Sequence, residues 1–226
     1  MKSKTQENYL QKTLFDFKAN DYSIYTYLLA KNIDFELHKD YSLQRLADKF
    51  GFDASMILDK LLVGGVVDFE DEIEFGNLQN SLLIEYLLKI HHSYLKESIP
   101  EITKSGSELL EEFRAIYPDL VETINFFNSL SNEVLEHVKE EELNLFPLFL
   151  ESDQQLLENK MKKLEIEHDE AEGALKQLNR RCDGFNCSYA DKNIKKYYQK
   201  LSEFSNKLYA HIHIEKDFLF PRLITI

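Results

Sequence analysis

The sequence is poor in the residues that interrupt helices, with only seven glycines and four prolines among its 226 residues. Glycine and proline punctuate strands and turns, so their scarcity favours long helices joined by short connections. Tryptophan is absent too, but 16 phenylalanines and 12 tyrosines supply large side chains for a buried core. We therefore predict an all-α protein.

Other absences bear on location and partners. No uncharged apolar run is long enough to span a bilayer, and the first residues lack the apolar core of a signal peptide. These two absences predict a cytoplasmic protein with no membrane partner. The formal net charge of −13 disfavours nucleic acid, because attraction to phosphates needs accumulated Lys and Arg.

The chain has only two cysteines, Cys182 and Cys187, in a C-x4-C spacing. Such a pair could form a disulfide, bind a metal or remain as two reduced thiols. We favour two reduced thiols, and the sequence leaves any function of the pair open.

Residues 1–63 are predicted to form a small helical domain. Its segment from Ser42 to Leu58 resembles a helix-turn-helix, with Gly51 at the turn and Phe50 among the inner apolar residues. The acidic residues in and after this segment would repel phosphates, which favours a packing or interaction module over a DNA-binding one. An acidic linker is predicted at 64–79 because it begins with Gly64-Gly65 and is rich in Asp and Glu.

Residues 80–226 carry four long amphipathic segments, whose apolar residues recur at helical spacing. Pro118 opens the second segment, which suits the first turn of a helix. Pro100 lies inside the first segment, where it is expected to kink the helix rather than end it. Short connections between helices of similar length predict an up-down-up-down four-helix bundle.

A motif occurs twice in this region. His137-Val-Lys-Glu-Glu141 is followed by Phe146-Pro147, and His211-Ile-His-Ile-Glu215 is followed by Phe220-Pro221 at the same distance. Residues four apart lie on one face of a helix, so each copy offers an imidazole and a carboxylate to the same point. Two such helices facing each other would make a metal site.

Each of the four segments places one histidine in its apolar stripe. His137 follows His92 by 45 residues, and His211 follows His168 by 43, which suggests that two helix pairs repeat about a pseudo-twofold axis. A single such histidine is usually a hydrogen-bonded core residue. Four at matching depths would be costly to bury without a cation. The predicted metal ligands are His92, His137, Glu141, His168, His211 and Glu215.

Several nearby residues compete for this role. His91 is the neighbour of His92, but only His92 is surrounded on its stripe by apolar side chains. His213 falls on a polar face and His38 lies in the other domain, so both are predicted to be bystanders. Five acidic residues are expected to be solvated or to support the ligands from outside: Glu140, Glu142, Glu167, Asp169 and Glu170.

Four imidazoles and two carboxylates suit two ions that share both carboxylates, each ion taking two histidines. Imidazole ligands select against calcium and magnesium, and the lack of thiolates argues against structural zinc or an iron–sulfur cluster. Iron is therefore the first choice and manganese the second. Such a pair of iron ions could carry an oxo bridge or bind O2, NO or peroxide.

The motifs together resemble the hemerythrin-like di-iron proteins, most closely the repair-of-iron-centres family. The resemblance covers about residues 80–224 and rests on His92 with Pro100 after it, on the two His-x-x-x-Glu motifs each followed by Leu-Phe-Pro, and on Glu-His168-Asp-Glu-Ala. It implies a hemerythrin-like bundle holding a non-haem di-iron centre. The implied terminal ligands are His92, His137, His168 and His211, and the implied bridges are Glu141 and Glu215.

The same resemblance implies a physiological role, which is to supply iron for restoring iron–sulfur clusters damaged by nitrosative or oxidative stress. The damaged iron–sulfur proteins would then be the partners. Many members carry an N-terminal domain with adjacent cysteines, whereas residues 1–63 contain none. Thiol chemistry assigned to that domain is therefore not carried over.

Two alternatives stay open at this point. The chain could be a sensor, carrier or redox enzyme that binds O2 or NO, or a regulator acting through residues 1–63. The sequence does not decide whether it is an enzyme, which redox state is the resting one, or whether it forms a homodimer.

Overall fold

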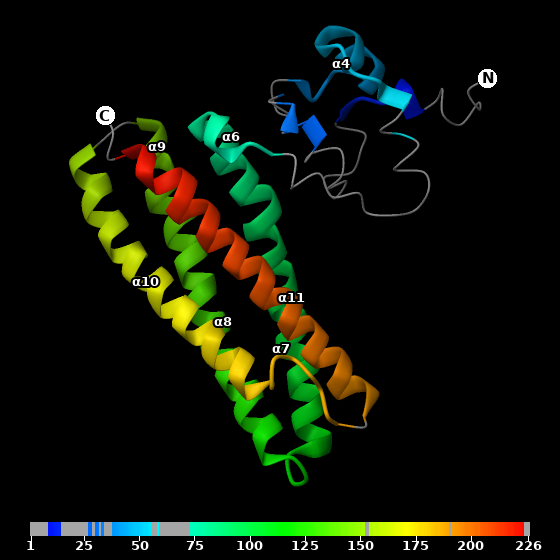
Figure 1. Cartoon of the computed structure of the whole chain (residues 1–226), viewed down its shortest axis with the longest axis vertical. Coiled ribbons are helices and arrows are strands. Elements are labelled where there is room, and N and C mark those ends of the chain that lie inside the picture. Colours follow the sequence, from blue (N-terminus) through cyan, green and yellow to red (C-terminus); the bar gives the residue numbers. More distant parts are fainter. Residues whose placement is uncertain are drawn as a thin grey trace. The chain divides into compact units, whose positions relative to one another are not determined.

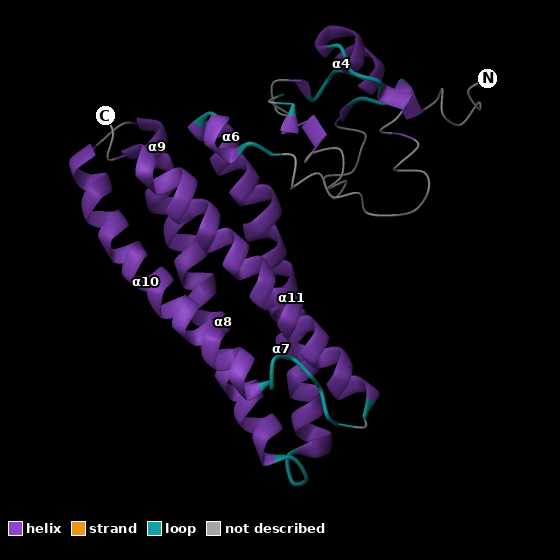
Figure 2. Cartoon of the chain, in the orientation of Figure 1, coloured by secondary structure: helices purple, strands orange, loops and turns teal. Residues whose placement is uncertain are grey.

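The computed structural model describes residues 9–14, 27, 28, 30, 31, 33, 38–55, 58, 73–151, 154–189 and 191–223. Within these ranges the regular elements are helices, and the only extended pairing is an isolated bridge between Thr13 and Ser42 (Figure 2). The chain divides into two compact units, Met1–Leu78 and Gln79–Ile226. The prediction of an all-α protein is confirmed.

The N-terminal unit is built around α4 (Leu43–Phe50). The Ser42 side chain caps its start by accepting from the Arg45 amide, and Gly51 ends it at φ 75°, a left-handed conformation that glycine adopts without steric cost. Leu43, Leu46 and Ala47 are buried, but Phe50 is 41% exposed, so its predicted inner position was wrong. Its ring packs edge-on against His38 instead.

The rest of this unit is described only in part. Much of the small helical domain predicted at 1–63, and the first part of the predicted linker, lie outside the described residues. A short 3-10 turn, η3 (Phe75–Asn77), precedes the second unit.

The second unit consists of four helical rods joined by short connections (Figure 1). In chain order its elements are α6 (Asn80–Tyr86), η4 (Leu87–His92), α7 (Ser93–Phe113), α8 (Pro118–Glu140), η5 (Glu141–Leu145), α9 (Phe146–Glu151), α10 (Gln154–Arg181), α11 (Lys192–Ile214), η6 (Glu215–Leu219) and η7 (Phe220–Leu223). Among them η4, η5 and η6 are π-helical and η7 is a 3-10 turn.

The rods form an antiparallel ring in which α7 packs on α8, α8 on α10, α10 on α11 and α11 on α7. Figure 1 shows successive rods running in alternating directions, which confirms the predicted up-down-up-down four-helix bundle. Helix α8 begins at Pro118 as expected, and α7 continues through Pro100. No helix in the described ranges is both long and apolar enough to cross a membrane.

Three helices of the bundle approach one another closely at Gly106, far from the repeated motifs. A Cβ atom built on Gly106 of α7 would lie 3.0 Å from Ile124 Cγ2 and 3.2 Å from Tyr197 Oη. Both neighbours are buried, at 0% and 1% exposure, so an added methyl group would have to displace packed side chains. Glycine at this position therefore allows α7, α8 and α11 to approach one another closely.

This contact predicts opposite effects for two glycine substitutions in helices. Gly106→Ala should lower the free energy of unfolding by about 1 kcal/mol, because overpacking outweighs the gain in helix propensity. Gly173→Ala in α10 should raise it by about 0.5–1 kcal/mol, because nothing lies within 4 Å of the added methyl group. Urea unfolding followed by circular dichroism measures both, and stabilisation by Gly106→Ala would show that the helices can separate there.

Candidate metal centre

The backbone departs from the α-helix where the repeated motifs lie. His92 is the last residue of the π-helix η4, and Glu141 and Glu215 are the first residues of η5 and η6. π-Helical turns are rare and often occur at functional sites. Phe146-Pro147 and Phe220-Pro221 follow the last two turns directly, and proline lacks the amide hydrogen that an α-helix needs there. The repeated sequence thus produces a repeated backbone irregularity.

The six predicted ligands come together in the core of the bundle. Five of them, His137, Glu141, His168, His211 and Glu215, each offer a nitrogen or oxygen atom such that these atoms all lie within 4.8 Å of one another. His92 falls outside that group, but its Nε2 lies 3.4 Å from Glu141 Oε2. Side chains from all four rods therefore share one small volume.

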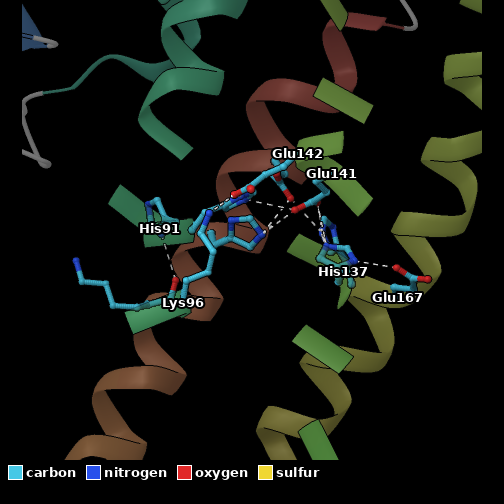
Figure 3. Close-up of polar contacts among 11 residues, drawn as sticks. His91, Lys96, His137, Glu141, Glu142 and Glu167 are labelled. Carbon is cyan, nitrogen blue, oxygen red and sulfur yellow. Dashed lines mark hydrogen bonds and ion pairs between the residues drawn. The ribbon is translucent and has the colours of Figure 1, made fainter. Parts of the chain in front are cut away.

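The two oxygens of Glu141 face different histidines (Figure 3). Oε1 lies 2.9 Å from His137 Nε2 and 3.7 Å from His168 Nε2. Oε2 lies 3.4 Å from His92 Nε2 and 3.7 Å from His211 Nε2. A carboxylate placed in this way can contribute one oxygen to each of two neighbouring ions.

Glu215 approaches the same centre from the opposite motif. Its Oε2 lies 3.1 Å from His168 Nε2 and 3.3 Å from His211 Nε2. His168 and His137 bring their Nε2 atoms within 2.9 Å of each other. The lone pairs of several imidazoles and carboxylates thus converge, as in a metal site.

Burial makes this convergence costly without a cation. Both carboxylates are fully buried, and within the described residues no donor meets hydrogen-bond geometry at any of their four oxygens. The same holds for both ring nitrogens of His211. Buried polar atoms without partners cost free energy, and a positive ion would satisfy them together. The donor set therefore fits a metal centre.

Two histidines are held from outside by further carboxylates. His92 Nδ1 donates to Glu142 Oε1 over 2.9 Å, and His137 Nδ1 donates to Glu167 Oε2 over 2.8 Å, the latter visible in Figure 3. A carboxylate can only accept, so the proton sits on Nδ1 and the Nε2 lone pair points to the centre. Lys96 in turn binds Glu142 at 2.7 Å.

The repeated phenylalanines cover the other two sides of the centre. Phe146 stacks on His92, with ring centroids 5.4 Å apart, and Phe220 stacks on His168 at the same centroid distance. Each Phe-Pro motif therefore packs an aromatic ring on a histidine that belongs to a different rod, which restricts the orientation of that imidazole.

Without a metal, protons compensate the charges of this cluster. Burial lowers the pKa of His92, but the neighbouring carboxylates of Glu141 and Glu142 outweigh burial and raise it to about 9. Burial raises the pKa of Glu215 well above its usual range, and the charge of Glu141 adds to that shift. Burial also acts to raise the pKa of Glu141, but the neighbouring imidazoles hold it well below its usual value. The two carboxylates therefore differ in their affinity for a proton, and Glu215 binds it more readily than Glu141.

The predicted bystanders separate into exposed and buried ones. His213 is 68% exposed and pairs with Asp217 at 2.6 Å, while His38 lies in the N-terminal unit beside Lys49. His91 is fully buried, which its sequence position did not reveal. Its Nδ1 donates to the Lys207 carbonyl oxygen over 3.4 Å, and it lies outside the group of converging ligand atoms.

The remaining acidic candidates have surface roles. Glu140 pairs with Lys160 at 2.9 Å and Asp169 pairs with Lys216 at 2.9 Å. Away from the centre, burial raises the pKa of the Cys182 thiol to about 12, and neither cysteine is in a disulfide.

A cavity of about 290 Å³ reaches the centre between α8, α10 and α11. His137 and His168 form its inner wall, and apolar residues such as Leu208 and Ile212 line its sides. Its remaining polar lining consists of four carboxylates: Glu133, Glu136, Glu167 and Glu170. The opening therefore offers negative charge along a path to two of the predicted ligands.

Residues 83–223 match the hemerythrin HHE cation-binding domain. The chain belongs to the hemerythrin family. This hemerythrin chain is 26% identical over 146 residues to a probable iron-sulfur cluster repair protein of Haemophilus influenzae, covering 63% of the chain and 64% of that protein. It is 24% identical to the iron-sulfur cluster repair protein YtfE of Cronobacter sakazakii, covering 85% and 87%. It is 22% identical to the iron-sulfur cluster repair protein ScdA of Staphylococcus epidermidis, covering 66% and 68%.

Two histidines of α11 provide a matched test of the hemerythrin centre. His211→Ala should reduce the bound metal, because it removes a fully buried imidazole that faces both carboxylates. His213→Ala should leave metal content unchanged, because that ring is exposed and points to Asp217. Elemental analysis of both purified variants decides this. Loss of metal from His213→Ala would mean that the helix is rotated from the position described.

A carboxylate substitution tests whether two ions share Glu141. Glu141→Ala should lose metal from both positions together, because each oxygen faces a different histidine pair. The measurement is metal per chain in the variant against the unaltered protein. Retention of one tightly bound ion would contradict the sharing of this carboxylate.

Proposed function

We propose that this hemerythrin-family chain is a non-haem di-iron protein that supplies iron for the repair of iron–sulfur clusters damaged by nitrosative or oxidative stress. The observation that carries the proposal is a buried cluster of four imidazoles and two carboxylates, without thiolates, that opens to the surface beside two of its histidines. The three relatives are named iron-sulfur cluster repair proteins, which supports the repair part of the proposal.

The set of imidazole and carboxylate ligands suits a metal ion that must be released. Thiolates bind iron more strongly than imidazole and carboxylate do, and hard carboxylate oxygens favour ferric over ferrous iron. Reduction would therefore weaken the interaction with Glu141 and Glu215. The acidic lining of the cavity gives a departing cation a path with favourable charge at each step.

The residues around the centre have separate roles in this function. Glu142 and Glu167 hold His92 and His137 with Nε2 facing inward, so that the site is ready to take up iron. Phe146 and Phe220 pack on His92 and His168, and the cavity between α8, α10 and α11 is the described route to the centre.

The test compares iron release from the two redox states. The purified protein should hold about two irons per chain, and the reduced protein should give iron to a ferrous chelator, or to an apo iron–sulfur protein, much faster than the ferric protein does. Chelator absorbance and recovery of the acceptor's cluster are the measurements.

A parallel titration with O2 and NO separates the competing function. Slow release in both states, together with reversible binding of either gas, would assign the chain to the sensors or carriers. One tightly held zinc and no iron would reject the proposal altogether.

A further inference from the structure

We propose that the two metal positions are unequal: His137 and His168 hold an exchangeable ion beneath the opening, and His92 and His211 hold a retained one. This inference rests on the proposed function, since it means that each centre delivers one iron and keeps the other. It also assigns one supporting carboxylate to each position, Glu167 to the exchangeable ion and Glu142 to the retained one.

The histidines divide into these pairs by distance. The ring centroids of His137 and His168 are 4.7 Å apart and those of His92 and His211 are 5.0 Å apart. The distances from His211 to His137 and to His168 are longer, 6.4 Å and 6.2 Å. Glu141 makes the same division, because Oε1 faces the first pair and Oε2 the second. Each position then takes one histidine from each repeated half.

Access differs between the two pairs. His137 and His168 both line the cavity that reaches the surface, and the His137 side chain is 11% exposed. His92 and His211 are 0% exposed and do not line that cavity. A phenylalanine stacks on one histidine of each pair, but only His211 also has the buried His91 ring beside it, at 5.9 Å. An ion between His137 and His168 has a route outward, whereas an ion between the other two must pass it.

Each position has one histidine that a carboxylate orients. Glu167 binds His137 Nδ1 and Glu142 binds His92 Nδ1. For the other two rings, His168 and His211, Nδ1 is buried and finds no hydrogen-bond partner in the part of the chain that is described. The sequence explains this difference between the halves.

The two halves of the repeat differ at the residues whose carboxylates bind a ligand histidine from outside. In the first half, the residue after Glu141 is Glu142. In the second half, the residue after Glu215 is Lys216, which binds Asp169 and Glu172 rather than a histidine. In the second half of the bundle, Glu167 directly precedes His168. The equivalent residue in the first half, directly before His92, is His91. Glu142 and Glu167 thus act on different positions, so each ion can be perturbed separately.

The experiment follows iron leaving the full-length protein. Reduced, iron-loaded protein is mixed anaerobically with excess ferrous chelator, and release should occur in two phases of one iron each. Glu167→Gln, which keeps the size of the side chain but removes its charge, should accelerate only the fast phase. Glu142→Gln should accelerate only the slow phase. The expected change is about 10- to 100-fold in each case, the usual effect of removing such a support.

Glu140→Gln is the matched control. Glu140 adjoins Glu141 in sequence, but its carboxylate binds Lys160 and Asn144 at the surface, so both phases should keep their rates. Circular dichroism of the metal-free variants shows whether they fold. A general loss of structure would accelerate both phases, whereas a positioning role changes one.

Release of both irons of the unaltered protein in a single phase overturns the proposal without recourse to any variant. Acceleration of the same phase by Glu142→Gln and Glu167→Gln overturns it as well. Two phases with no transfer to an apo iron–sulfur protein would reject the donor function and leave the inequality standing. Transfer to the apo iron–sulfur protein in a single phase would support the donor function and reject the inequality of the two metal positions.

Discussion

The structure depends on two carboxylates, Glu141 and Glu215, that face each other in the core of an acidic helical bundle. Two like charges at this depth are tolerated only with positive charge between them. Four imidazoles surround them, and in the absence of metal this environment raises the pKa values of Glu215 and His92 and lowers that of Glu141. Metal binding must therefore displace protons, and the bundle is a scaffold that keeps this exchange of cations away from water.

Much of this arrangement could be predicted from the sequence, because it follows from local periodicity. An apolar stripe at helical spacing places His92, His137, His168 and His211 at the same depth whatever the details of packing. The same rule chose His92 over His91, and the structure puts His92 at the carboxylates. The fold class needed only stripe lengths and short connections.

The rest of the site depends on backbone geometry that cannot be predicted from the spacing of apolar residues in the sequence. The π-helical turns at His92, Glu141 and Glu215 rotate the helix locally, so an ideal wheel misplaces the residues that follow. Periodicity therefore did not single out Glu142 among the five acids expected to be solvated or to support the ligands, and in the structure it binds His92 of a neighbouring rod. Phe50 was misplaced for a simpler reason: α4 ends there, and the ring packs outside against His38. Which histidines share an ion depends on how close the rods come.

The close contact at Gly106 gives the bundle two mechanically different ends. Gly106 lies 14 residues after His92, which is about 21 Å along a helix, and there α7, α8 and α11 approach one another closely. At the other end three of the rods are interrupted by π-helical or 3-10 turns, whose hydrogen bonds are weaker than those of an α-helix. Local opening should therefore start at the metal end and stop before Gly106, so the centre can loosen while the far end stays folded. In such a bundle the end at Gly106 stays rigid, and flexibility is concentrated at the metal end, where cations have to enter and leave.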